Sequence, residues 1–155
     1  MQSEDKATDY IRTLIMVNND RQSAFETALN EVEDENLKSW FKQMSDQGKC
    51  YRDELINQIP QELRKSHEFT YDTLSGRIYK LWMDIKHLVS KHNTHAILSS
   101  CEFGEDSALR IYNEALENKE IFSDEVYEII HRHMLKIKED FNILMKLRKL
   151  EESEV

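Results

Sequence analysis

Four side chains that could bind a metal or react lie close together in the stretch CEFGED, residues 101–106. Cys101 offers a thiol, and Glu102, Glu105 and Asp106 offer carboxylates. Residues three or four apart share one face of a helix. The cluster could therefore supply half of a metal site, pair with a cation on another helix, or be solvated surface. The choice depends on the helices that surround it.

A second pattern with possible chemistry is Glu128-Ile129-Ile130-His131, a Glu-x-x-His spacing. A di-iron centre in a helical bundle takes a Glu from each of two helices and a Glu-x-x-His from each of the other two, all pointing inward. Whether these residues could contribute to such a centre depends on the direction in which each helix turns them.

Apolar residues recur at helical spacing along most of the chain. The spacing predicts long helices over about 4–32, 35–59, 94–117 and 123–150, and a shorter one over about 74–91. Asp34, Thr94 and Ser123 are the expected N-caps, because their side-chain oxygens can accept a free backbone N–H. Pro60 is expected to end the second helix.

The first two long helices have a short link, as do the last two, so each pair should be an antiparallel hairpin. The stretch 60–93 is too long for a tight turn and fits the single long crossover of ferritin-like bundles, here carrying a helix of its own. We expect one all-α domain over 1–155, a ferritin-like four-helix bundle.

The helical phase argues against an intact di-iron centre. At 100° per residue, Glu128 lies about 180° and His131 about 120° from the middle of the last helix's apolar stripe, so both should face solvent. Asp46 also points outward, and the second helix has Met44, Gly48 and Tyr51 at its inward positions through the middle. Too few ligands face the interior for a di-iron site.

Glu105 is different, because it lies only about 30° from the middle of its stripe. A buried carboxylate is costly unless it is paired. Arg21 and Asn18 lie on the inward face of the first helix, so we expect a buried Arg21–Glu105 ion pair, with Tyr51 or Tyr112 donating a hydrogen bond. The open alternative is that Arg21 and Glu105 lie at the stripe edge and extend to water.

A metal role stays open as a second alternative. His133 is also expected to point inward, where a core histidine bonded across the bundle is the simpler interpretation. Together with Glu105 and a carboxylate such as Asp140, it could form an irregular site for iron, manganese or zinc. No catalytic residue set is predicted.

Composition limits the remaining classes. The net charge is −9 and no strong basic patch occurs, so nucleic acid is not an expected partner. No apolar run is long enough for a membrane span. The start MQSEDKATDY lacks the basic and apolar parts of a signal peptide, and two cysteines are too few for a disulfide framework, so a bacterial-type cytoplasm is expected. Cys101 should be buried and Cys50 exposed.

Three stretches carry a resemblance to a known family. They are AILSSCEFGEDSALRIYNEAL (96–116), SGRIYKLWMDIK (75–86) and NDRQSAFETALNEVEDENLKSWF (19–41). The chain resembles a bacterial ferritin-like family of unknown function, marked by Cys-Glu-Arg-Gly-Glu-Asp on its third long helix; Phe103 replaces the usual Arg. The resemblance covers nearly the whole chain and implies a fold rather than an activity.

The sequence therefore predicts a non-catalytic ferritin-like protein without an intact di-iron centre or another cofactor. By family analogy its role is stress-associated or structural, exercised through a protein partner or a homo-oligomer. The alternative is a metal-binding or oxidative-stress protein that uses the irregular site.

Overall fold

The computed structural model describes residues 2–64 and 94–153, and in this part the chain is all-α. The four long helices are α1 (Gln2–Glu31), α2 (Glu35–Ile56), α5 (Thr94–Leu116) and α6 (Asp124–Ser153). A short helix α3 (Gln61–Arg64) follows α2, and a 3₁₀ turn η1 (Lys119–Ile121) links α5 to α6. The helix predicted over 74–91 lies outside the described residues.

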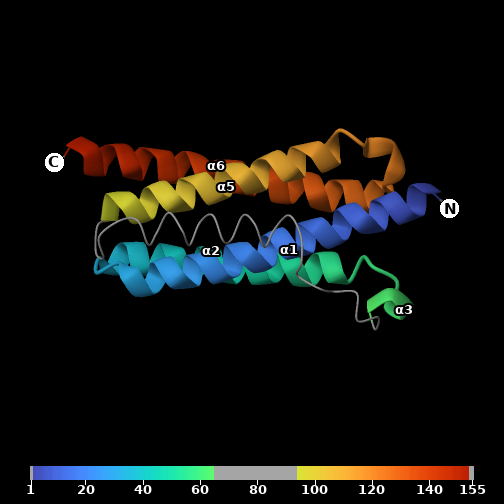
Figure 1. The fold of residues 1–155 in the computed structure, drawn as a ribbon, viewed down its shortest axis with the longest axis horizontal. Helices are drawn as coiled ribbons and strands as arrows, with labels where there is room; N and C mark the ends of the chain where they lie inside the picture. Colours follow the sequence, from blue (N-terminus) through green and yellow to red (C-terminus); the bar gives the residue numbers. More distant parts are fainter. Residues whose placement is uncertain (1, 65–93, 154–155) are drawn as a thin grey trace.

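The long helices pack in two pairs (Figure 1). α1 lies against α2, and α5 lies against α6; across the pairs, α1 packs against α5. Each pair is an antiparallel hairpin with a short link, as the sequence predicts. The start of α1 and the end of α6 lie at opposite ends of the long axis. None of the described helices has a stretch long and apolar enough to cross a membrane.

Local chemistry sets the helix boundaries. The Asp34 carboxylate accepts the Leu37 N–H at 2.9 Å and begins α2, and the Ser123 hydroxyl accepts the Val126 N–H at 3.2 Å at the start of α6. α2 ends at Ile56 rather than at the predicted residue 59. Before Pro60, the N–H groups of Gln58 and Ile59 turn to carbonyls three residues back, since the residue preceding a proline disfavours the helical region.

Gly48 lets α1 and α2 approach closely. A Cβ at this position would lie 3.0 Å from both the Asn18 carbonyl oxygen and the Gln22 amide nitrogen of α1. Only glycine fits such a backbone contact without a shift of one helix. The close approach therefore lies beside Asn18 and Gln22 of α1.

Two apolar clusters make up the core. The first, beside η1, has Leu14, Leu55, Tyr112, Ile130 and Ile137 among its fully buried members. The second, beside the α1–α2 link, includes Phe25, Phe41, Leu98, Cys101 and Leu144. On α1 and α5 the chain passes from one cluster to the other through Asn18, Arg21 and Glu105, each no more than 1% exposed. We call this intervening level the polar layer.

Candidate functional site

A bidentate ion pair between α1 and α5 forms the centre of the polar layer. Arg21 Nε donates to Glu105 Oε1 at 2.7 Å, and its Nη2 donates to Glu105 Oε2 at 3.2 Å. The two side chains are 1% and 0% exposed. Two parallel N–H···O bonds between a guanidinium and a carboxylate fix the orientation of both groups and add to the attraction between their charges.

Arg21 also joins the other side of the layer. Its Nη1 donates to Asn18 Oδ1 at 2.8 Å, and its Nη2 donates to Gln47 Oε1 of α2 at 2.6 Å. The guanidinium carbon lies 5.8 Å from the centre of the Tyr51 ring. The buried cation is thus surrounded by acceptors and an aromatic ring, as desolvation of a charge requires.

α6 enters the layer through Asp140, which is fully buried. Gln47 Nε2 donates to Asp140 Oδ2 at 3.1 Å, and Lys136 Nζ donates to Asp140 Oδ1 at 3.2 Å. Gln47 accepts a hydrogen bond from Arg21 and donates one to Asp140. A continuous chain of hydrogen bonds therefore runs from α1 through α2 to α6.

A second path leads from Asn18 to the surface. Asn18 Nδ2 donates to Tyr112 Oη at 2.7 Å, and Tyr112 Oη lies 2.9 Å from His133 Nδ1. His133 Nε2 lies 2.6 Å from Glu54 Oε1. Glu54 is partly exposed, at 32%, and its other oxygen accepts from Arg132 Nη2 at 2.5 Å.

Arg21 at one end of this path and Glu54 at the other determine which group donates in each hydrogen bond. Arginine can only donate, so the Asn18 oxygen faces Arg21 and the Asn18 amide nitrogen faces Tyr112. The Tyr112 proton is then free to go to His133 Nδ1, which must be the accepting nitrogen. His133 therefore carries its proton on Nε2 and donates it to Glu54.

Burial and neighbouring charges set the ionisation states. Burial lowers the pKa of His133 to about 4, against the favourable effect of Glu54, so the imidazole is neutral at pH 7. Burial raises the pKa of Glu105, and Arg21 opposes this shift through its charge and hydrogen bonds. Burial also raises the pKa of Asp140, against the effects of Gln47 and Lys136.

Glu54 has the opposite balance. Burial raises its pKa, but the hydrogen bonds from Arg132 and His133 outweigh burial, so the pKa of Glu54 lies below its ordinary value. The outer end of the second path is therefore an anion next to a cation, and its inner end is neutral.

In the residues of the irregular metal site, each oxygen or nitrogen that could bind a metal already takes part in a hydrogen bond. The two Glu105 oxygens are bound by Arg21, the two Asp140 oxygens by Gln47 and Lys136, and the two His133 nitrogens by Tyr112 and Glu54. Over residues 2–64 and 94–153, no group of three or more His, Cys, Asp and Glu is placed to hold a metal ion.

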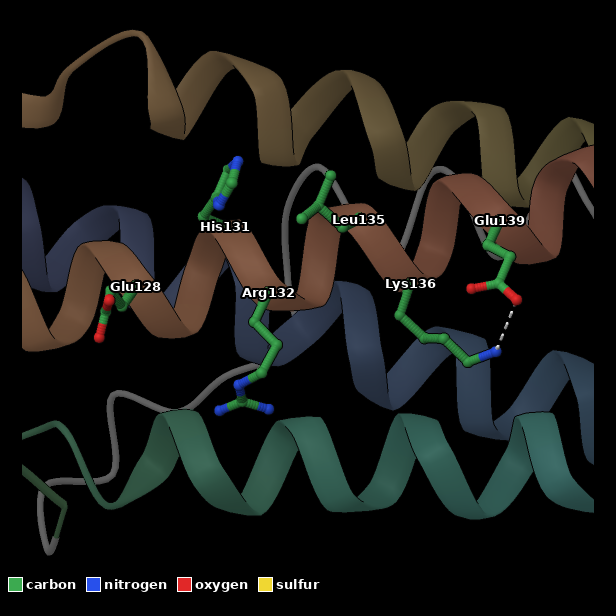
Figure 2. Close-up of a pocket in the computed structure, with 6 residues that line it drawn as sticks. All are labelled: Glu128, His131, Arg132, Leu135, Lys136 and Glu139. Atoms are coloured by element: carbon green, nitrogen blue, oxygen red, sulfur yellow. Dashed lines mark ion pairs between the residues drawn. The ribbon is translucent and has the colours of Figure 1, made fainter.

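Glu128 and His131 are both exposed, as their helical phase predicts. Figure 2 shows them on the outer side of α6, among the six residues that line a shallow surface hollow, and their side chains do not converge. In the same hollow Lys136 pairs with Glu139 at 3.8 Å. The Glu-x-x-His spacing therefore does not form half of a bundle metal site.

The two tyrosines act differently from the prediction. Neither donates to the ion pair: Tyr112 bonds Asn18 and His133, and Tyr51 stacks its ring on His133, with ring centres 3.7 Å apart and planes at 9°. In the stretch CEFGED, residues 101–106, Asp106 pairs with Arg110 at 3.1 Å, while Glu102 accepts a hydrogen bond from Arg148 of α6. Cys101 is buried and Cys50 exposed, as predicted.

Sequence reasoning missed four members of the two paths. Gln47 and Glu54 lie seven residues apart on α2, one turn before and after the inward Tyr51, so the flank of that stripe carried a usable signal. On α6, Arg132 directly precedes His133, and Lys136 lies one turn before Asp140. Charged residues at a stripe edge are normally solvated, and only the position of the facing helix shows otherwise.

Fold and site together define the class as an all-α four-helix protein with a buried polar layer. The chain belongs to the family described as domain of unknown function DUF2383, whose model matches residues 6–118. No curated protein matches the chain. The matched range includes α1 from Lys6 onward, α2 and α5, whereas α6, which contributes His133 and Asp140, follows it.

Proposed function

We propose that this protein is a ferritin-like bundle in which an arginine–carboxylate network takes the place of a di-iron centre, and that it acts as a structural or interaction protein rather than an enzyme. One observation carries the proposal: the Arg21 guanidinium, 1% exposed, binds both oxygens of Glu105 inside the bundle.

The ferritin-like part rests on the order of the helices. Two antiparallel hairpins are separated by the long stretch from Ile56, where α2 ends, to Thr94, where α5 begins. A single long connection between two hairpins is the arrangement of ferritin-like folds. By this interpretation residues 1–155 form one domain, and α6 is its fourth helix.

The donor set argues against a di-iron site. Such a site needs inward carboxylates and imidazoles with free lone pairs. Here a guanidinium lies among the inward groups, where it would repel a metal cation at short range. A metal would have to displace Arg21 from Glu105 and leave an unpaired buried charge, which is strongly unfavourable.

Elemental analysis of untagged protein, produced with added iron, manganese or zinc, tests this proposal. We expect metal well below one ion per chain and no rise in the unfolding temperature when each metal is added. Stoichiometric metal that is lost in Glu105→Gln and in Asp140→Asn would contradict the proposal and favour the irregular site with His133.

A structural or interaction role implies a partner, which we propose to be another protein or a second copy of the chain, in a cytoplasmic and stress-associated setting. Sedimentation of the purified chain separates the two cases. A concentration-dependent increase in mass would indicate a homo-oligomer, and a constant monomer mass would direct the search to cross-linking in cells.

A further inference from the structure

The path from Tyr112 to Glu54 has the parts of a proton-coupled redox site. The Tyr112 hydroxyl is 2.9 Å from His133 Nδ1, a nitrogen that the donor direction leaves as an acceptor. The other ring nitrogen is 2.6 Å from Glu54, the partly exposed end of the path. Tyr112 and His133 are each 0% exposed, so water does not compete for the phenol proton.

We propose that Tyr112, His133 and Glu54 form a one-electron redox site, in which an outer-sphere one-electron oxidant converts Tyr112 to a neutral phenoxyl radical while His133 takes the phenol proton. This activity goes beyond the proposed structural role and does not depend on it.

One cycle of oxidation and reduction at Tyr112 moves one electron and one proton. The electron leaves Tyr112 for the oxidant, the O–H bond of Tyr112 breaks, and an N–H bond forms at His133 Nδ1. The resulting imidazolium passes its Nε2 proton to Glu54, from which it reaches water. Return of an electron from a thiol or another one-electron reductant restores the phenol: the Nδ1 proton of His133 passes back to the Tyr112 oxygen, and His133 Nε2 regains a proton from water through Glu54.

The surroundings of Tyr112 favour this coupled route over simple ionisation. Burial raises the pKa of Tyr112 far above neutrality, so a phenolate does not form at pH 7. Loss of an electron alone would leave a buried cation beside the Arg21 cation, which is unfavourable in a low-dielectric interior. Transfer of the proton to His133 moves the positive charge toward Glu54, an anion that can accept it.

Other tyrosines offer a contrast. Within the described part of the chain, Tyr112 is the tyrosine whose hydroxyl contacts an imidazole nitrogen. Tyr10 accepts a hydrogen bond from Asn118, and Tyr127 stacks on His131 at the surface of α6. Oxidation of a tyrosine without a built-in base has to pass its proton to water or buffer, so its rate should depend on buffer concentration.

The test uses the full chain with Cys50→Ser, which removes an exposed thiol that could quench radicals. Photogenerated tris(bipyridine)ruthenium(III) is the oxidant, and the tyrosyl radical is followed by electron paramagnetic resonance and transient absorption. We expect a radical whose formation is slower in D₂O and independent of buffer concentration. Tyr112→Phe should abolish it, and Tyr10→Phe or Tyr127→Phe should not.

Two further variants separate the redox role from a purely structural one. His133→Gln removes the base and should slow radical formation at least about 100-fold, the lower end of what a positioned base contributes. Glu54→Gln leaves the Tyr112–His133 bond in place and should slow formation in the same direction, which keeps the test decisive if His133→Gln unfolds. A buffer-independent tyrosyl radical that survives Tyr112→Phe would overturn the proposal. So would a rate that rises with buffer concentration for the radical that Tyr112→Phe removes.

Discussion

At the scale of single residues, His133 makes stability depend on pH. Its folded pKa of about 4 lies below the ordinary 6.5, so between these values the unfolded chain binds more protons than the folded one. The contribution of His133 to stability is therefore fully present above pH 6.5 and is lost as the pH drops toward 4, by about 3 kcal/mol for this group.

Urea unfolding at pH 7 and at pH 4.5 measures this effect. His133→Gln should remove most of the His133 part of the pH dependence, while His131→Gln, at an exposed site two residues earlier, should leave it in place. The variants are compared with one another because Glu105 and Asp140, with raised pKa values, contribute to the pH dependence in all of them. Glu54 contributes with the opposite sign, and His133→Gln also removes the part of its lowered pKa that His133 causes, which flattens the slope in the same direction. Equal slopes for the two variants would contradict a neutral, buried His133.

The two cysteines should differ in reactivity. Cys101 is fully buried, and burial raises the pKa of its thiol well above the ordinary value, so little thiolate forms. A thiol reagent should label Cys50 quickly in the native protein and Cys101 only after unfolding. Cys50→Ser and Cys101→Ser identify the labelled site, and rapid labelling of native Cys50→Ser would contradict the burial of Cys101.

Residue reasoning located most of the interior groups but not their partners. Helical phase placed Asn18, Arg21, Glu105 and His133 inward, because an apolar stripe fixes which positions face the core. It could not show that Tyr112 bonds His133 instead of the ion pair. That choice depends on the height of α5 relative to α6, and helical phase carries no information on the offset between helices.

At the scale of the helices, Gly48 sets the distance between α1 and α2. Gly48→Ala would place a methyl group 3.0 Å from backbone atoms of Asn18 and Gln22. Alanine favours a helix by about 1 kcal/mol over glycine, yet we expect a net loss of about 1–3 kcal/mol because backbone cannot move aside as a side-chain tip can.

Lys49→Ala is the matched control, since Lys49 is exposed on the same helix and the change leaves helix propensity nearly unaltered. Both free energies come from urea unfolding. A Gly48→Ala protein as stable as the parent would show that the helices are not in close contact there.

The sequence predicts the starts of α2 and α6 better than the end of α2. The caps at Asp34 and Ser123 form as predicted, because capping is a local interaction of residues three apart. The end of α2 was predicted three residues late, at 59. Ile59 fits the apolar stripe and is 1% exposed, but the turn before Pro60 buries it without continuing the helix.

At the scale of the whole molecule, α6 should be indispensable although it follows the family match. Ile130, His133, Ile137, Asp140 and Leu144 of α6 are all 0% exposed. A chain that ends at Asn118 would expose both apolar clusters and strand Tyr112. We expect the truncated chain to lose the cooperative unfolding transition and the near-ultraviolet circular dichroism of the full chain. The full chain should unfold in a single transition that coincides by fluorescence and by circular dichroism. A cooperative 1–118 chain would contradict a single domain.

The overall arrangement of four helices in two hairpins followed from periodicity and loop lengths, which are properties of the chain itself. The polar layer followed only in part. Arg21 and Glu105 are 84 positions apart in the sequence, and their contact requires α1 and α5 to adopt one particular alignment. The role of Gln47, which bonds both Arg21 and Asp140, could not be predicted without the position of α2 relative to α1 and α6.

We infer that Glu105 neutralises Arg21 and does not bind a metal, and a double-mutant cycle read by urea unfolding distinguishes the two roles. Glu105→Gln and Arg21→Met should each cost about 3–5 kcal/mol, because each leaves a buried charge without its partner. The double variant should recover much of that loss, since it strands no charge. Glu128→Ala with His131→Ala, both exposed, should stay within about 0.5 kcal/mol and serves as the control. Small additive losses from the two single variants, or a bound metal that Glu105→Gln releases and Arg21→Met does not restore, would contradict the account.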